Sequence, residues 1–165
     1  KSAFYGIYPN YADNFNISGS TFTFLDSGAS PYGVVVVNSN LGIIENNIFS
    51  VSFAGMQTGV YISGATNSKI VNNTMNGLYD GIVLYPSGVV GTQINDNTIS
   101  NSIHYGVYIA AATVTGTSLS NNKICSSGGV MDIYNFASCS TTYHSGNKCN
   151  SAKVSCSGSC AIPCS

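Results

Sequence analysis

The chain has 165 residues, of which only 7% are charged, and its formal net charge is −1. An average soluble domain carries roughly 25% charged residues, so the polar surface must come mainly from asparagine, serine, threonine and glycine. The near-zero net charge argues against a nucleic-acid partner, and no apolar run approaches the roughly 18 residues of a membrane-spanning helix, so we expect no membrane insertion.

A glycine followed by alternating apolar residues recurs along the chain from its first residues onward. The steps between successive glycines are 27, 26, 22, 25 and 23 residues. A fixed period of this length is the signature of a repeating structural unit. The glycines are Gly6, Gly33, Gly59, Gly81, Gly106 and Gly129.

A second motif follows each of the first five glycines in the sequence: an apolar residue, a spacer and a pair of small polar residues. It reads "ISGSTF" from Ile17, "IENNIF" from Ile44, "IVNNTM" from Ile70, "INDNTI" from Ile94 and "LSNNKI" from Leu119. Its steps are 27, 26, 24 and 25 residues, so the two motifs drift together. Length differences therefore fall in the connections and not in the expected strands.

Each unit holds three short runs that are rich in valine, isoleucine, tyrosine, phenylalanine and threonine, as strands are. Helical periodicity is absent, and glycines and paired asparagines interrupt every window. A propeller blade needs four strands, and leucine-rich repeats need a leucine consensus. Three strands in about 25 residues fit one coil of a parallel β-helix, in which each strand pairs with its equivalent one coil away.

The repeats, such as "GIVL" from Gly81 followed by "INDNTI", resemble those of the right-handed parallel β-helix superfamily with the pectate-lyase-like fold. The resemblance covers about residues 4–135. It implies an all-β, right-handed parallel β-helix (solenoid) of about six coils. We expect coils over residues 1–136 and a disulfide-rich C-terminal cap over residues 137–165. Many unrelated functions share this fold, so the resemblance implies the fold more than an activity.

The paired asparagines predict an internal ladder. Asn47, Asn73, Asn97 and Asn122 occupy one column, and Ser20 takes that place in the first coil. Stacked amides can hydrogen-bond along the axis of the solenoid and satisfy a tight turn.

The second and fourth residues after each glycine should point outward, because the first and third are apolar and should face the core. The outward positions alternate between aromatic and aliphatic side chains, where polar ones are usual. Either a loop or a neighbouring chain covers this stripe, or it is a flat platform on which sugar rings stack. The candidate binding face comprises Tyr8, Val35, Tyr61, Val83, Tyr85 and Tyr108.

Asp80, His104 and Tyr105 form the candidate catalytic group. "LYDG" and "IHYG" occupy matching positions in successive coils, which brings these three side chains to adjacent coils. They could orient, accept and donate protons in a β-elimination or a hydrolysis, or they could be a surface hydrogen-bond cluster. The resemblance implies clustered carboxylates, often with calcium, for enzymes that cut acidic polysaccharides, and the acids here are scattered. We expect no cofactor and no metal site.

An even number of cysteines, clustered in the last quarter, predicts a disulfide framework and a secreted or extracellular location. Their spacing does not choose the pairing. Asn16 and Asn72 fit the pattern of N-glycosylation acceptors. The cysteines are Cys125, Cys139, Cys149, Cys156, Cys160 and Cys164.

The leading functional hypothesis is a secreted, non-catalytic module for self-assembly or for surface and glycan contact. The alternative is a polysaccharide lyase or glycoside hydrolase, and a third class is ice binding, which normally needs a regular threonine array. The expected partners are like chains, stacked head-to-tail or laterally, or a polysaccharide. The first coil, around Gly6, has little sequence before it and should expose strand edges. Either further coils or a cap precede Lys1 in a longer precursor, or another chain stacks on these edges.

Overall fold

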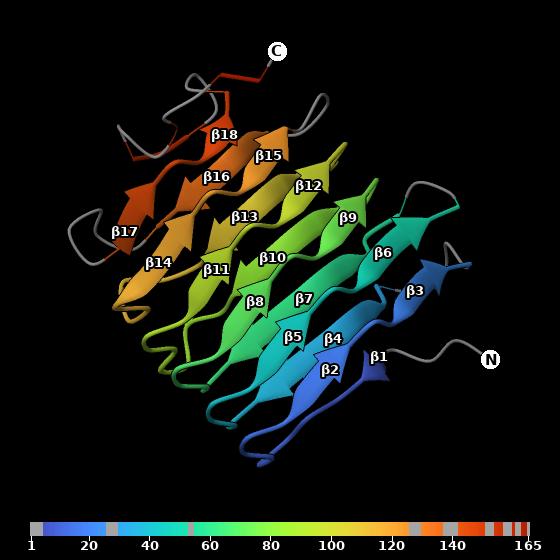
Figure 1. Ribbon diagram of the computed structural model, residues 1–165, viewed down its shortest axis with the longest axis vertical. Helices are drawn as coiled ribbons and strands as arrows, with labels where there is room; N and C mark the ends of the chain where they lie inside the picture. Colours follow the sequence, from blue (N-terminus) through green and yellow to red (C-terminus); the bar gives the residue numbers. More distant parts are fainter. Residues whose placement is uncertain are drawn as a thin grey trace.

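The computed structural model describes residues 5–25, 30–52, 55–125, 130–136, 142–150, 154–156, 160 and 163–164. This part of the chain forms three parallel sheets wound around one core (Figure 1). Each coil gives one strand to each sheet, and each strand pairs with its equivalent in the next coil. The expected all-β parallel β-helix is confirmed. No helix in the described residues is long and apolar enough to cross a membrane.

Each sheet contains six strands. Sheet A consists of β1 (Tyr5–Ile7), β4 (Tyr32–Val37), β7 (Thr58–Ser63), β10 (Asp80–Leu84), β13 (Tyr105–Ile109) and β16 (Met131–Asn135). Sheet B consists of β2 (Asn16–Ser18), β5 (Ile43–Glu45), β8 (Lys69–Val71), β11 (Gln93–Asn95), β14 (Thr117–Ser120) and β17 (Thr142–Ser145). Sheet C consists of β3 (Thr21–Phe24), β6 (Ile48–Val51), β9 (Thr74–Asn76), β12 (Thr98–Ser100), β15 (Lys123–Cys125) and β18 (Lys148–Cys149).

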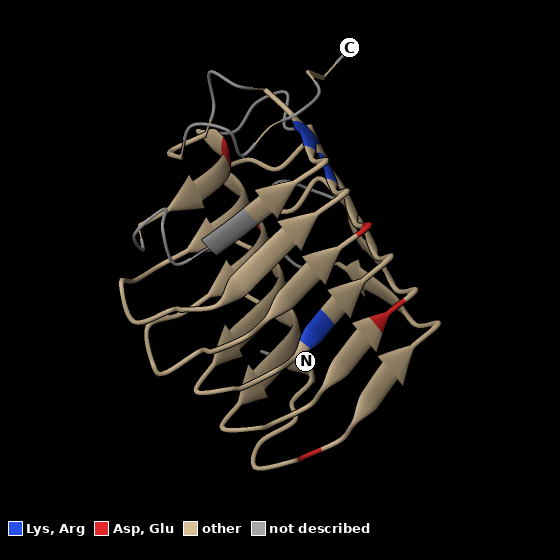
Figure 2. Ribbon diagram, turned by 60° about the vertical axis from the view of Figure 1, so that its left-hand side comes forward, with Lys and Arg blue, Asp and Glu red and all other residues tan. Residues whose placement is uncertain are grey.

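The core is a set of apolar columns that run along the solenoid axis. In sheet A the inward column contains Val34, Val60, Ile82 and Val107, and all four are fully buried. Charged side chains are isolated spots on otherwise uncharged strands (Figure 2). Burial of apolar area, at about 25 cal/mol per Å², therefore provides most of the driving force for folding.

The asparagine ladder is confirmed at the turn between sheets B and C. The Nδ2 of Asn73 donates to the Oδ1 of Asn97 at 3.0 Å and to the carbonyl of Ile44 at 2.9 Å. The backbone N–H of Asn47 donates to the Oδ1 of Asn73 at 3.0 Å. Each buried amide thus bonds to the coils on both sides, which is what a buried polar group requires. The ladder also includes Asn147, which accepts from the Nδ2 of Asn122 at 3.0 Å.

The residue before each ladder position has a left-handed backbone. The φ angles are 56° at Asn46, 52° at Asn72, 57° at Asp96 and 55° at Asn121. Asparagine and aspartate adopt this conformation more readily than most residues. The paired motif in the sequence therefore encodes a turn residue followed by a ladder residue.

The glycines that begin the repeats are needed where coils approach closely. A Cβ atom at Gly59 would lie 2.7 Å from the carbonyl oxygen of Gly81 and 2.9 Å from a methyl group of Leu78. Backbone atoms cannot move aside at such a distance, so a side chain is excluded here.

The C-terminal end of the solenoid is covered by its own chain. Val154 forms a parallel bridge with Ile133, and Val154 and Cys160 pack against the core. The carboxylate of Asp132 accepts a hydrogen bond from the N–H of Asn150 at 2.7 Å. Strands β17 and β18 lie after residue 136, so the coil pattern continues into the segment for which the sequence predicts a cap. The division into two domains stays a prediction.

Candidate functional site

The outer face of sheet A carries the aromatic stripe that the sequence predicts. The six predicted binding residues all lie on this face, at positions whose side chains point away from the core columns. The structure adds four more tyrosines to them, and we call the whole set the tyrosine face. It comprises Tyr5, Tyr8, Tyr32, Val35, Tyr61, Val83, Tyr85, Tyr105, Tyr108 and Tyr134.

The rings of the N-terminal half contact one another from coil to coil. Ring centroids lie 5.9 Å apart for Tyr5 and Tyr32, 5.4 Å for Tyr32 and Tyr61, and 5.5 Å for Tyr61 and Tyr85. Tyr8 stacks on Tyr5 at 5.1 Å. Ring pairs at these separations add about 0.5–1.5 kcal/mol each beyond the area they bury. The rings are therefore held in place before any ligand arrives.

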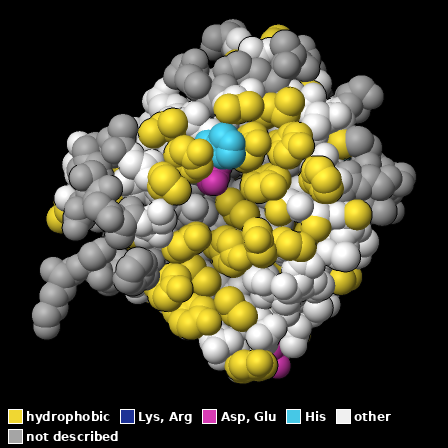
Figure 3. All heavy atoms as spheres, turned by 180° about the vertical axis from the view of Figure 1, so that it is seen from behind, with side chains coloured by type: hydrophobic (Ala, Val, Ile, Leu, Met, Phe, Trp, Pro, Cys, Tyr) yellow, Lys and Arg dark blue, Asp and Glu magenta, His cyan; other side chains and the backbone are white. Residues whose placement is uncertain are grey.

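A second group of rings covers the C-terminal half of the face. Tyr105 lies 4.8 Å from Tyr108 and 5.1 Å from Tyr134, and Tyr108 lies 5.6 Å from Tyr134. Figure 3 shows hydrophobic side chains spread over this side of the molecule, with histidine and acidic atoms among them. The sheet therefore presents a broad aromatic surface rather than a deep cleft.

The two valines of the predicted binding face are far more buried than its tyrosines. Val35 is 4% exposed and Val83 is 5% exposed, whereas Tyr8 is 47% exposed. Both valines point outward, but larger side chains around them cover them. Val35 forms the floor of a shallow pocket of about 180 Å³ whose walls are Tyr5, Tyr8, Tyr32, Val37 and Tyr61.

Burial and crowding change the acidity of the phenols. Burial raises the pKa of Tyr61 to about 12, and the neighbouring Tyr85 and Tyr32 add to the shift. Burial also raises the pKa of Tyr32, Tyr105 and Tyr108 above the ordinary value. These four phenols are therefore uncharged at neutral pH, and their hydroxyl groups can both donate and accept hydrogen bonds.

Asp80, His104 and Tyr105 come together as the sequence predicts. The Nδ1 of His104 lies 3.2 Å from an Oδ1 of Asp80, and the N–H of Tyr105 donates to the same oxygen at 3.1 Å. The imidazole packs on Tyr105 with ring centroids 3.6 Å apart and on Tyr79 at 4.8 Å. Burial raises the pKa of the Asp80 carboxyl, although its contacts with His104 and Tyr105 favour the charged form.

The chemistry open to this cluster is limited because the described strands of sheet A hold no second exposed carboxylate. Glycoside hydrolysis needs two carboxyl groups roughly 5 to 10 Å apart. In the strands of sheet A the only other acid is Asp132, which is fully buried and bonded to Asn150. The hydrogen bond to Asp80 orients the His104 ring, so the cluster can hold a polar ligand group as well as move a proton.

No metal centre is found within the described residues, where no three histidine, cysteine or acidic side chains cluster. His104 precedes β13 in sheet A, whereas His144 lies on β17 in sheet B. Cys125 is bonded to Cys164, and Cys149 to Cys160. Cys156 is also in a disulfide, and Cys139 lies outside the described residues.

The two predicted glycosylation positions are exposed. The Asn16 amide donates to the carboxylate of Glu45 at 3.0 Å, and the Asn72 amide donates to the Oδ1 of Asn46 at 2.6 Å. Their modification stays a prediction.

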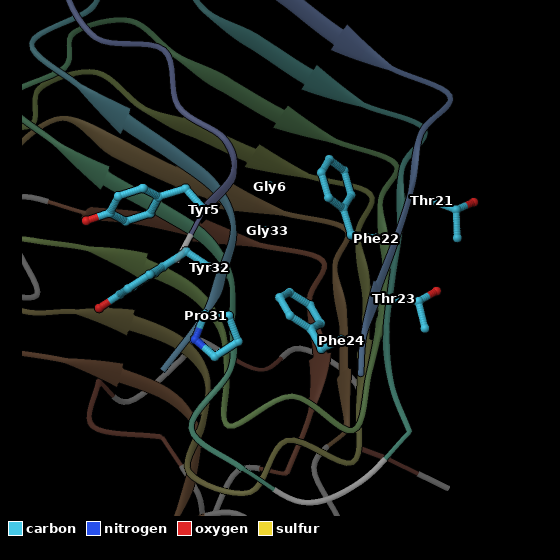
Figure 4. Close-up of a pocket in the computed structure, with 9 residues that line it drawn as sticks. All are labelled: Tyr5, Gly6, Thr21, Phe22, Thr23, Phe24, Pro31, Tyr32 and Gly33. Carbon is cyan, nitrogen blue, oxygen red and sulfur yellow. The ribbon is translucent and has the colours of Figure 1, made fainter. Parts of the chain in front are cut away.

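A hollow of about 300 Å³ lies at the N-terminal end, between sheets A and C. Figure 4 shows Phe22 and Phe24 pointing into it from β3, while Thr21 and Thr23 point away. Phe22 stacks on Phe49 of the next coil, with centroids 4.6 Å apart and planes at 5°. The hollow is thus the end of the core column, and the side chains that Figure 4 shows pointing into it from β3 are apolar rings.

Sequence reasoning left Tyr5, Tyr32, Tyr105 and Tyr134 out of the binding face, and it named Tyr105 only in the catalytic group. The first three directly precede a repeat glycine, in "YG" pairs that the sequence shows plainly. They were left out because outward positions were counted only from the residues after each glycine. Tyr134 pairs with Tyr108, and it was left out because the last repeat was counted from Gly129, whereas Met131 and Ile133 pair with Tyr105 and Val107.

Comparison with protein families gives one finding on the chain as a whole. Residues 1–153 match the family described as periplasmic copper-binding protein (NosD). Comparison with curated proteins and with solved structures gives no match. The family is one of parallel β-helix proteins, so the resemblance inferred from the repeats is confirmed.

Proposed function

This chain belongs to the NosD family of parallel β-helix proteins, and from that premise we propose that it is a non-catalytic module that binds glycan outside the cytoplasm. The tyrosine face is the proposed binding surface. The periplasmic description of the family and the disulfides support a location in an oxidising compartment.

One observation carries the proposal: the tyrosine face is broad, pre-organised and uncharged apart from Asp80. Aromatic rings bury the apolar faces of a flat ligand, and their hydroxyl groups pair with its polar edges. Tyr8 and Tyr85 are 47% and 46% exposed, so they are available for such contact. Sugars combine apolar C–H faces with hydroxyl edges, which matches both properties.

The copper named in the family description does not fit the described part of this chain. Copper sites use imidazole, thiolate and thioether donors gathered at one point. Here the two histidines lie on different sheets, and none of the described cysteines is a free thiol. The proposal therefore assigns no role to copper.

The rival enzymatic function rests on the Asp80 and His104 pair. Such a pair can act as a general base, but a hydrolase also needs a second carboxylate, and a lyase that cuts an acidic sugar needs a means to neutralise its charge. The strands of sheet A contain no lysine and no arginine. The non-catalytic function is therefore the better supported of the two.

Self-assembly is the second candidate, and the exposed N-terminal end favours it. In β1 all three residues are exposed, and Ile7 is 37% exposed although its column faces the core. An open edge of this kind can pair with a like chain, head-to-tail or laterally. Light scattering over a range of concentrations distinguishes a monomer from such stacks.

A combined binding and degradation screen tests the proposal. The purified chain is incubated with a panel of polysaccharides at several pH values, and both retention on the polysaccharide and release of shorter products are measured. We expect binding to at least one polysaccharide and no products. The double variant Tyr61→Ala/Tyr108→Ala should lose binding, and Tyr11→Ala, which removes a tyrosine that is 77% exposed outside sheet A, should keep it. Robust cleavage by the parent chain would overturn the proposal.

A further inference from the structure

The middle outward column of sheet A alternates between tyrosine and valine over its first five coils, and Tyr134, which pairs with Tyr108, ends the alternation in the sixth. Tyr8 follows β1, and in the next four coils this column reads Val35, Tyr61, Val83 and Tyr108. Tyr61 is the direct neighbour of Val35 on one side and of Val83 on the other. The fold itself repeats every coil, so the alternation belongs to the side chains and not to the backbone.

The alternation places a valine between two tyrosines at two positions of the tyrosine face, which we call notches. In the first, Val35 lies between Tyr8 and Tyr61, and this notch is the pocket of about 180 Å³. In the second, Val83 lies between Tyr61 and Tyr108 in the same register. The two floors are almost equally buried, at 4% and 5% exposure.

The spacing of the notches specifies the repeat of a ligand that fits both. Strands of neighbouring coils are separated by about 4.8 Å, so two coils advance about 10 Å along the axis. That advance is close to the length of a disaccharide in an extended polysaccharide. In a β-1,4-linked chain alternate sugars face opposite ways, so the same sugar face recurs at every second residue.

The charge on this side of the molecule selects against an acidic chain. Lys69 lies on β8 in sheet B, and Lys123 and Lys148 lie on β15 and β18 in sheet C. The partly exposed charge on sheet A is the carboxylate of Asp80, whose side chain is 14% exposed beside His104. An anionic sugar would meet a like charge with no described cation nearby, whereas a neutral sugar can donate its hydroxyls to this pair.

We propose that the tyrosine face binds an uncharged, extended β-1,4-linked polysaccharide that lies along the solenoid axis, with every second sugar seated in a notch. This inference rests on the proposed function and names the ligand class of the same surface. Tyr8, Tyr61 and Tyr108 separate the seated sugars, and the Asp80 and His104 pair accepts and donates hydrogen bonds at one edge.

Calorimetric titration with defined oligosaccharides tests the inference. The probes are cello-oligosaccharides from two to six sugars long, malto-oligosaccharides of the same lengths as α-linked controls, and oligogalacturonates as charged controls. We expect the affinity for cello-oligosaccharides to rise at least about tenfold between the disaccharide and the tetrasaccharide, which reaches both notches. The α-linked and charged probes should bind at least about tenfold more weakly than the matched cello-oligosaccharide.

Filling a notch is the sharper version of the same test. Val35→Tyr and Val83→Tyr each replace a floor with a ring, and each should weaken binding of the hexasaccharide at least about tenfold. Thr74→Tyr adds a ring to the exposed face of sheet C and should leave binding unchanged. Melting curves of all three variants establish that they fold like the parent chain.

The outcomes separate this inference from the proposed function. Equal binding of α- and β-linked probes, or unchanged binding by both notch variants, overturns the inference and leaves glycan binding standing. No binding of any oligosaccharide or polysaccharide overturns both. A stable dimer that Val35→Tyr abolishes would identify the face as a contact between copies of the chain and would also overturn the inference.

Discussion

The outer faces of sheets A and C differ completely although the two sheets share one core. Sheet A presents tyrosine and valine along strands of up to six residues, such as β4 and β7. Sheet C presents mainly threonine, serine, asparagine and lysine along strands of two to four residues. Both are held by the same kind of inward apolar column. The inward residues therefore specify the coil, and the outward residues of each sheet are free to specialise.

The largest expected effect comes from breaking the asparagine ladder, which joins the coils from which both sheets are built. Asn73→Leu removes the acceptor of both the backbone N–H and the Nδ2 of Asn47, and both of these donors are buried. Leaving buried donors unpaired costs about 1–3 kcal/mol for each group, so we expect at least that loss in the free energy of unfolding.

Gln93→Leu is the control for this ladder variant, because Gln93 is an exposed amide on β11. It should change stability by no more than about 0.5 kcal/mol. Chemical denaturation of the two variants measures the difference. Equal midpoints would show that the ladder contributes no more to the free energy of unfolding than an exposed amide does.

The next effect separates the two faces by binding. Tyr108→Ala removes a ring that touches both Tyr105 and Tyr134. It should weaken glycan binding by about tenfold or more, because the ligand loses the apolar surface of that ring. Thr98→Ala on sheet C should leave binding unchanged. Affinity electrophoresis in a gel that contains polysaccharide compares the variants side by side. Equal retardation of both would remove the distinction between the faces.

Alkaline pH should weaken sheet A selectively. The pKa of Tyr61 in the folded chain is about 12, compared with 10.0 for a free tyrosine. A raised folded pKa means that this contribution to stability is complete below pH 10 and is lost as the pH rises toward 12. We expect Tyr61→Phe to lose less stability than the parent chain over that interval. Thermal melting at a series of pH values measures the stability of both proteins. An equal loss of stability in the two proteins would contradict the raised pKa of Tyr61.

The smallest effect is expected at the candidate catalytic group. We expect neither the parent chain nor His104→Ala to degrade polysaccharides, and we expect His104→Ala to weaken glycan binding only modestly. If the enzymatic function were correct, the same variant would reduce turnover by about a hundredfold or more. Assays of reducing ends released from polysaccharides, with Tyr79→Phe as a neighbouring control, decide between the two.

The features that the sequence predicted are those set by the repeat itself. The glycine steps and the paired asparagines gave the coils, the inward columns and the ladder, because a residue that recurs once per coil stacks on its equivalent. Asn147 fits the same motif in "SGNKC", with Gly146 at a φ of 63° as the turn residue, but it lies beyond the last clear pair. Asn147 could have been predicted from the sequence if the motif had been allowed to have glycine in place of the first asparagine of the pair.

The features that could not be predicted from the sequence depend on how side chains of different coils pack. Val35 and Val83 were correctly expected to point outward, but their burial follows from the surrounding rings, which no single-strand pattern reveals. The pairing of Cys125 with Cys164 and of Cys149 with Cys160 depends on the path of the C-terminal segment. The contact between Asp80 and His104 was predictable, because the repeat alignment alone brings them to adjacent coils.

The most direct test of the tyrosine face is a titration of the chain with a β-1,4-linked hexasaccharide, followed by nuclear magnetic resonance. The ring signals of Tyr8, Tyr61 and Tyr108 should shift together with a single affinity, while the backbone amide signals of Thr74 and Thr98 on sheet C stay in place. Shifts centred on sheet C, or no shift of any tyrosine ring at saturating oligosaccharide, would contradict glycan binding by this face.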